Sequence, residues 1–73
     1  MSIFSERIKE TRQKLKLSQQ KIAELASLDV RLYQYYESDK RCPSLANAEK
    51  ISDVLGVSLD FLCGRTDNSE INK

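Results

Sequence analysis

The chain has 73 residues, of which 40% are hydrophobic and 32% are charged, with a formal net charge of +1. These values favour one small folded domain over a disordered segment. With two cysteines and no histidine, the sequence offers no metal-ligand spacing, no cofactor motif and no nucleophile–base pair, so we expect no enzyme. The apolar runs are too short to cross a membrane, and we expect no secretion leader. We interpret Cys42 and Cys63 as reduced thiols of a cytoplasmic protein.

Charge is unevenly distributed along the chain. Residues 7–41 carry nine Lys or Arg and five Asp or Glu, a net +4, whereas residues 42–73 carry three and five, a net −2. A basic first half suggests one surface for a polyanion. An ordinary solvated helix face is the alternative, and charge alone favours that alternative.

Hydrophobic residues recur with the period of α-helices, and the patterns of strands and hairpins are absent. Ser5 is the candidate N-cap of a first helix, and Arg7 points mostly away from its apolar side. The inner face of this helix is expected to carry Ile8, Thr11, Arg12 and Leu15.

A second, short helix is expected after its N-cap Ser18, and a third, over residues 30–38, after Asp29, whose charge also suits the helix dipole. Ser27 and Leu28 form a tight connection between these two helices. The apolar side of the second helix comprises Ile22, Ala23, Leu25 and Ala26. Two short helices joined in this way form a known supersecondary unit.

Residues 38–43 have the composition of a loop, and Pro43 prevents a helix from running through it. Ser44 then caps a fourth helix that ends at Gly56, and Ser58 caps a short fifth helix that ends near residue 64. We therefore expect an all-α, compact five-helix bundle over residues 1–64, followed by a flexible polar tail over residues 65–73.

The third helix holds all three tyrosines of the chain. At about 100° per residue, Tyr33 and Tyr36 face the core, whereas Tyr35 faces solvent on the same side as Arg31. A polar outer face with several donors fits a DNA major groove, where Val30 can contact a thymine methyl group and Arg31 can take guanine edges or a phosphate. A solvated helix surface is the alternative for each of these outer residues.

Glu37 lies toward the core in this helix, where an unpaired carboxylate is costly. Arg12, on the inner side of the first helix, is the expected partner. A bidentate pair between them would hold the third helix against the first. The alternative is that Glu37 reaches solvent.

The segments IKETRQKLKLSQQKIAEL, YYES, CPSLANAEKIS and LGVSLDFLCG, in this order and spacing, resemble the Cro/C1-type (XRE family) helix-turn-helix domain of phage repressors and bacterial regulators. The resemblance runs from about Ile8 to Gly64. It implies a five-helix, lambda-repressor-like fold whose second and third helices bind DNA. The base contacts that it implies are Val30, Arg31, Gln34 and Tyr35. The implied phosphate contacts are Gln19, Ser38, Lys40 and Arg41, and the implied structural ion pair is Arg12 with Glu37.

Several positions depart from the family pattern, among them Ser27 and Tyr33. The family often has glycine, in a left-handed conformation, where Ser27 stands. Ser27 must therefore either accept strain or bend the turn differently. The family usually has Ile or Val where Tyr33 stands, and the larger ring needs additional room.

We predict a sequence-specific, double-stranded DNA-binding regulator of transcription, of the repressor type. It is expected to act as a homodimer on a two-fold operator with half-sites about 34 Å apart, without a small-molecule effector. No separate dimerisation domain fits in the chain, so the fifth helix is the expected interface, through Leu59, Phe61, Leu62 and Cys63. Closure of the core is the alternative role for these four residues. The alternative function is a protein-binding adaptor of the antitoxin or antirepressor type that uses the same fold.

Overall fold

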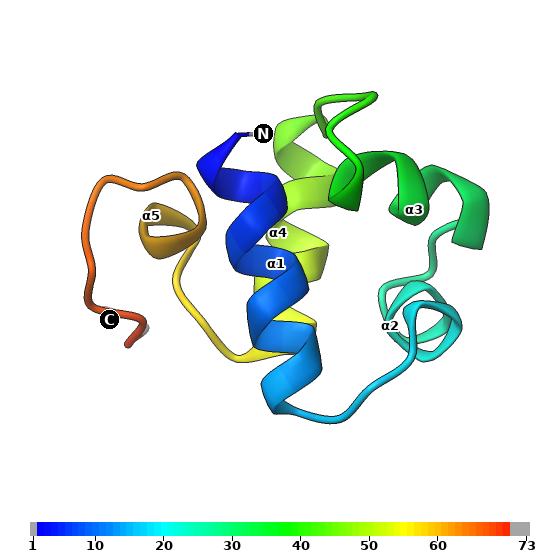
Figure 1. The fold of residues 1–73 in the computed structure, drawn as a ribbon, viewed down its shortest axis with the longest axis horizontal. Coiled ribbons are helices and arrows are strands. Elements are labelled where there is room, and N and C mark those ends of the chain that lie inside the picture. Colours follow the sequence, from blue (N-terminus) through cyan, green and yellow to red (C-terminus); the bar gives the residue numbers. More distant parts are fainter. Residues whose placement is uncertain (1, 71–73) are drawn as a thin grey trace.

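Five α-helices follow one another in the computed structural model, which describes residues 2–70 (Figure 1). Their bounds are α1 (Ile3–Lys14), α2 (Gln19–Leu25), α3 (Val30–Glu37), α4 (Leu45–Leu55) and α5 (Leu59–Leu62). α1 crosses in front of α4, with α2 and α3 on one side of this pair and α5 on the other. No strand occurs within the described residues. The expected all-α, five-helix fold is confirmed.

Polar side chains cap the start of each helix. The predicted caps of α2 to α5 each accept a hydrogen bond from a first-turn backbone N–H group: Ser18, Asp29, Ser44 and Ser58. The prediction for α1 is wrong, because Ser2 is the N-cap and its hydroxyl accepts from the N–H of Ser5 at 3.1 Å. Ser5 lies inside the first turn, where it is buried and donates its hydroxyl to the Ser2 carbonyl. A hydroxyl at residue 2 thus satisfies an N–H group that would otherwise lack a partner.

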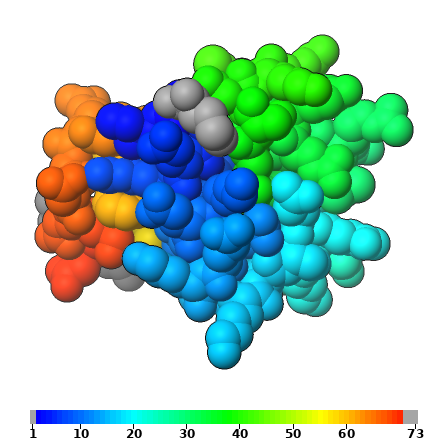
Figure 2. Space-filling model, in the orientation of Figure 1, coloured from blue at the N-terminus to red at the C-terminus, as the bar shows by residue number. Residues whose placement is uncertain are grey.

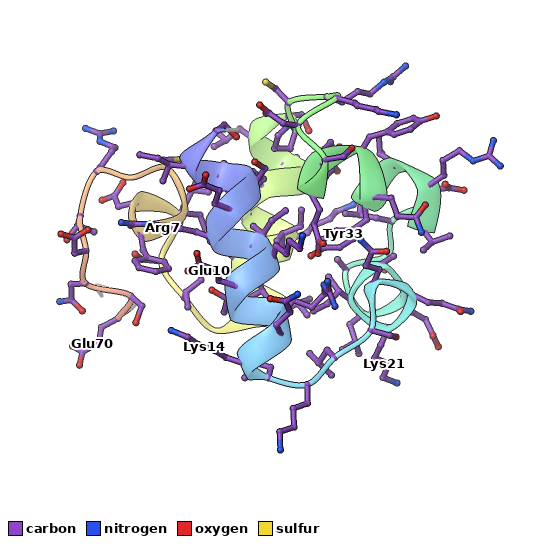
Figure 3. All side chains as sticks on the ribbon, viewed as in Figure 1. Arg7, Glu10, Lys14, Lys21, Tyr33 and Glu70 are labelled. Carbon is purple, nitrogen blue, oxygen red and sulfur yellow. The ribbon has the colours of Figure 1, made fainter. Side chains whose placement is uncertain are left out.

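The hydrophobic core fills the space between the helices. Its buried members are Ile8, Ile22, Ala23, Tyr33, Tyr36, Ile51, Leu55, Val57 and Leu62. Tyr33 is fully buried and Tyr36 is 3% exposed, as predicted, and Figure 3 shows Tyr33 between α3 and α1. A buried aromatic side chain removes a large apolar area from water, so these two rings fix the position of α3.

Two leucines expected in the core are instead on the surface. Leu15 is 48% exposed and Leu25 is 52% exposed. Each stands at the C-terminal end of its helix, just before a residue with positive φ turns the chain: Lys16 (φ 59°) after α1 and Ser27 (φ 55°) after α2. In α2 the buried side continues to Ala26, which is 3% exposed, so Leu25 lies beside the inner face rather than beyond its end.

The turn between α2 and α3 keeps the left-handed conformation at a residue with a side chain. Ser27 has a φ of 55° and is exposed, and the Leu28 N–H donates to the Ala23 carbonyl at 2.8 Å. A left-handed conformation costs a non-glycine residue about 1–2 kcal/mol. Of the two outcomes that the sequence left open at this position, strain is the one observed. Gly56, the predicted end of α4, has a φ of 70°.

The segment after α5 lies at the end of the molecule opposite α2 and α3 (Figures 1 and 2). Arg7 was expected to point away from the core, but it binds both α5 and this segment. Its guanidinium donates to the carbonyls of Phe61 and Thr66 at 2.6 and 2.7 Å and pairs with Asp67 at 2.7 Å. It also lies 4.3 Å from the centre of the Phe61 ring. Residues 71–73 of the expected tail lie outside the described residues, and its flexibility stays a prediction.

Candidate nucleic-acid interface

The start of α3 is set by its cap. Asp29 Oδ1 accepts from the backbone N–H groups of Arg31 at 2.8 Å and Leu32 at 3.3 Å. Behind this cap, the inner side of α3 is buried through Tyr33, Tyr36 and Glu37. One side of α3 is thus fixed in the protein, which leaves the opposite side for a partner.

The outer side of α3 carries the predicted base-contacting residues. Val30 is 38% exposed, Arg31 and Gln34 are exposed, and Tyr35 is half-buried. The Tyr35 ring has the guanidinium of Arg41 5.9 Å from its centre. Tyr35 therefore presents one part of its surface to solvent and another to a neighbouring cation.

The predicted phosphate-contacting residues of the next turn lie directly beside this face. Ser38, Lys40 and Arg41 are exposed in the turn that ends α3. The N–H of Lys40 donates to the Tyr35 carbonyl at 2.9 Å, and Asp39 takes a left-handed φ of 62°. Two cations are therefore held at the C-terminal end of the helix, where they also suit its dipole.

Arg12 and Glu37 meet in a bidentate ion pair. Arg12 Nε donates to Glu37 Oε2 at 2.6 Å, and Nη2 donates to Oε1 at 3.1 Å. The third donor of Arg12, Nη1, binds the Leu17 carbonyl at 2.9 Å. The pair thus holds the end of α3 to α1, as expected from the sequence, and the bond to Leu17, which was not predicted, adds the turn before α2.

Gln19 has a role that the sequence did not indicate. Its Nε2 donates to Glu37 Oε1 at 3.0 Å, and its Oε1 accepts from Gln34 Nε2 at 3.3 Å. Both glutamines were expected to contact DNA, one at a phosphate and one at a base. The structure joins them to each other and to the buried ion pair.

The contacts around Glu37 shift the pKa values of Glu37 and of the neighbouring Tyr33. Burial is the strongest single influence and opposes ionisation of Glu37, but Arg12, the neighbouring Tyr33 hydroxyl and Gln19 together lower the pKa of Glu37 below its ordinary value. Burial first, and then Glu37, raise the pKa of Tyr33 far above its ordinary value. The Tyr33 hydroxyl has no hydrogen-bond partner among the described residues. At neutral pH the site thus holds an ionised Glu37 and a neutral Tyr33.

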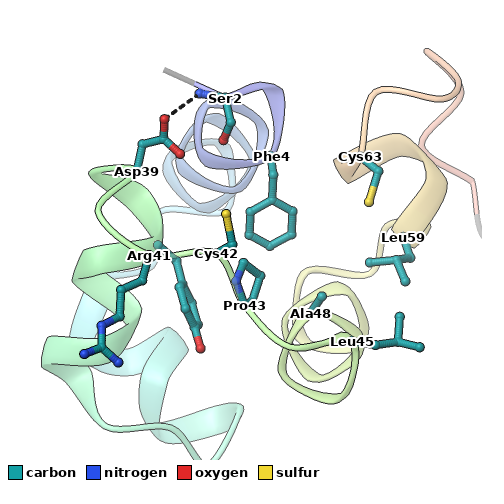
Figure 4. A pocket seen from close by; sticks show the side chains of 11 residues that line it. Ser2, Phe4, Asp39, Arg41, Cys42, Pro43, Leu45, Ala48, Leu59 and Cys63 are labelled. Carbon is teal, nitrogen blue, oxygen red and sulfur yellow. Dashed lines mark hydrogen bonds between the residues drawn. The ribbon is translucent and has the colours of Figure 1, made fainter.

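The four candidates for a dimer interface occupy different environments. Leu62 is fully buried in the core, so it is not available to a partner and its assignment to an interface is corrected. Phe61 is half-buried beneath Arg7. Leu59 and Cys63 line an apolar hollow of about 400 Å³ between α1, α4, α5 and the 38–44 loop, together with Phe4 (Figure 4). Two of the four candidates therefore remain on an accessible apolar surface.

Residues 2–70 contain neither a group of metal ligands nor a helix that could span a membrane. Within this range, no three His, Cys, Asp or Glu side chains are grouped to hold a metal ion. None of the helices described there has the length and apolar character needed to cross a membrane. Cys42 and Cys63 are both free and exposed.

The known proteins that resemble this chain are regulators of transcription. A family model described as helix-turn-helix matches residues 8–62. The cryptic phage CTXphi transcriptional repressor RstR of Vibrio cholerae serotype O1 is 34% identical over 62 residues, which cover 85% of this chain and 55% of RstR. The SPbeta prophage-derived uncharacterized HTH-type transcriptional regulator YonR of Bacillus subtilis (strain 168) is 40% identical over 60 residues, 82% of this chain and 56% of YonR. The HTH-type transcriptional regulator ImmR of the same organism is 34% identical over 70 residues, 96% of this chain and 55% of ImmR.

The chain spans little more than half the length of these curated relatives. No solved structure matches it significantly. The family model nevertheless covers most of the chain, from α1 to the last residue of α5. The matched residues include the turn between α2 and α3 and the outer face of α3. The chain therefore belongs to the Cro/C1-type helix-turn-helix family.

Proposed function

We propose that the protein is a sequence-specific, double-stranded DNA-binding regulator of transcription, of the repressor type. One observation carries the proposal. α3 is buried along one side by Tyr33, Tyr36 and Glu37, whereas its other side exposes Val30 and Arg31. A rigidly held helix with an exposed, donor-rich side is the arrangement by which helix-turn-helix domains enter a major groove.

In this proposal, α3 reads base edges. Arg31 donates two hydrogen bonds to guanine, one to O6 and one to N7, and Val30 contacts a thymine methyl group. Tyr35 follows on the same side of the helix, next to these two, and Gln34 lies beside them. The contacts distinguish base pairs because the major groove presents a different pattern of donors, acceptors and methyl groups for each pair.

Contacts to the DNA backbone come from both ends of the helix-turn-helix formed by α2 and α3. Lys40, Arg41 and Ser38 lie in the turn after α3, and Gln19 is the first residue of α2. Such contacts position the protein on the duplex and supply most of the salt-dependent affinity. Two of them, Lys40 and Arg41, belong to the nine basic residues of the first half of the chain.

We further propose that the regulator acts as a homodimer on a two-fold operator, in the cytoplasm and by binding alone, without catalysis, cofactor or small-molecule effector. One short helix reads few base pairs, so two copies are needed for useful specificity. Leu59 and Cys63, on the apolar hollow beside α5, support an interface there. The names of RstR and ImmR, as a repressor and a regulator of transcription, support the function of the whole molecule.

Selection of bound duplexes from a random DNA library tests the proposal. The expected result is one enriched motif with a dyad, whose half-sites are about 34 Å apart. A motif without a dyad would contradict the homodimer. If the protein is not retained on heparin or random duplex even at low salt, the DNA-binding function is wrong and the protein-binding adaptor takes its place.

A further inference from the structure

A continuous series of hydrogen bonds leads from the buried ion pair to the surface of α3. Arg12 donates to Glu37 at 2.6 Å, Gln19 donates to Glu37 at 3.0 Å, and Gln34 donates to Gln19 at 3.3 Å. The three contacts to Glu37 and Gln19 join α1, α2 and α3. The series starts at a charge with 4% of its side chain exposed and ends at an exposed amide.

The buried carboxylate determines the direction of every bond in this series. An ionised carboxylate only accepts hydrogen bonds, so Gln19 must present its Nε2 group to Glu37. The Oε1 atom of Gln19 is then directed away from Glu37, and any partner there must donate. Gln34 supplies that donor through its own Nε2. Neither amide can flip without placing two acceptors against each other.

This direction leaves donors at the surface. Each Nε2 group carries two hydrogens, of which one is used within the series, so one N–H of Gln19 and one of Gln34 stay free of these bonds. Both glutamines line a polar hollow of about 330 Å³ between α1, α2 and α3, and Lys9 stands on the same hollow. Phosphate oxygens only accept hydrogen bonds, so this set of donors suits the DNA backbone.

We propose that Gln34 is a positioning residue rather than a reader of bases: it acts through Gln19, whose free N–H it holds toward one phosphate of the DNA backbone. This inference rests on the proposed function of DNA binding. It changes the role that the resemblance gives to Gln34. Base reading is then carried by Val30, Arg31 and Tyr35, and Gln34 contributes to affinity without contributing to sequence preference.

A double-mutant cycle on the selected DNA site tests the proposal. The variants are Gln34→Ala, Gln19→Ala and the double variant, with Gln20→Ala, at the exposed neighbouring position of α2, as the control. Each single variant should weaken binding about five- to tenfold, the effect of one hydrogen bond. The double variant should bind no more weakly than Gln19→Ala, and the Gln20 control should bind like the wild type. Additive losses would overturn the proposal.

Three further measurements separate positioning from the other roles of Gln34. Binding of Gln34→Ala to every single base-pair change of the site should show a uniform loss. A loss confined to one base pair would assign Gln34 to base reading and overturn the proposal. Nuclear magnetic resonance of the free protein should show a shift of the Gln19 side-chain amide in Gln34→Ala, with an unchanged unfolding midpoint. A markedly lower midpoint would show a merely structural role, and absence of DNA binding by the wild type would overturn both this inference and the proposed function.

Discussion

The guanidinium of Arg12 faces the carboxylate of Glu37 with two hydrogen bonds, of 2.6 and 3.1 Å, and thereby joins α1 to the last residue of α3. Only 13% of the Arg12 side chain and 4% of the Glu37 side chain are exposed. An ion pair so far from water is costly to break, because removal of one partner leaves the other as an unpaired buried charge.

Arg12→Ala should lower the free energy of unfolding by about 3–5 kcal/mol, since Glu37 would then lose its cation while it stays buried. Urea denaturation followed by circular dichroism measures the change. Arg31→Ala is the matched control, because this arginine is exposed and should alter stability by no more than about 0.5 kcal/mol. An Arg12→Ala midpoint equal to that of the control would contradict the buried pair.

Stability should fall when the solution is acidified. Because the pKa of Glu37 is lower in the folded protein than its ordinary value of about 4.3, its contribution is fully present above that pH. The contribution is lost as pH falls through the native pKa. Denaturation at a series of pH values from neutral to strongly acidic measures this loss.

Glu37→Gln provides the comparison for this pH dependence. The variant is expected to be less stable at neutral pH, and its difference from the wild type should shrink as the pH falls below about 4.3. Glu24→Gln, at an exposed position, should keep the wild-type slope. A constant difference between Glu37→Gln and the wild type at all pH values would show that Glu37 does not supply the dependence.

Ser27→Gly should stabilise the protein by about 0.5–1 kcal/mol, because glycine adopts a positive φ without strain but loses more entropy on folding. Ser27 is exposed with a φ of 55°, so little contact is lost. Ser38→Gly is the control, since Ser38 has a φ of −88° and gains nothing from glycine. Thermal unfolding of the two variants measures the contrast, and a lower midpoint for Ser27→Gly than for the wild type would rule out strain at this turn.

Arg31→Ala and Lys40→Ala should weaken DNA binding in different ways. The loss for Arg31→Ala is expected to be about 1–3 kcal/mol and to relax the preference at one base pair. Lys40→Ala should weaken binding to all sequences alike and reduce the salt slope by about one phosphate contact. Titration of the selected site and its single-base variants at several salt concentrations measures both effects. A sequence-selective loss in Lys40→Ala would contradict its phosphate role.

Much of the fold follows from local sequence signals. Ser18, Asp29, Ser44 and Ser58 are caps whose side-chain oxygens have one obvious set of backbone N–H groups to satisfy. The prediction for the first helix took Ser5, but serine also stands at residue 2, and the preference for serine at a cap does not choose between the two positions. The angular positions of Tyr33, Tyr36 and Glu37 follow from the helical period because α3 is short and regular.

The remaining features depend on irregular segments or on side chains meeting across helices. Arg7 binds one carbonyl in α5 and one in the chain after it, and no periodicity predicts where such carbonyls lie. Gln19 and Gln34 were expected to face DNA, and their mutual contact requires the crossing of α2 and α3. One signal could have indicated this contact. Glu37 is a buried carboxylate that needs hydrogen-bond donors, and Gln19 and Gln34 are polar residues of the two helices that meet beside it.

The two arginines of α1 have a mechanical consequence. Arg7 and Arg12 are five positions apart, so they leave the helix about 140° apart, one toward the segment after α5 and the other toward α3. α1 is thus held to α5 and the segment after it through Arg7, and to α3 through Arg12. In a dimer that forms through α5, α1 would therefore determine the distance between the two α3 helices. The spacing between the half-sites of the operator would then depend on α1, a helix that contacts no base.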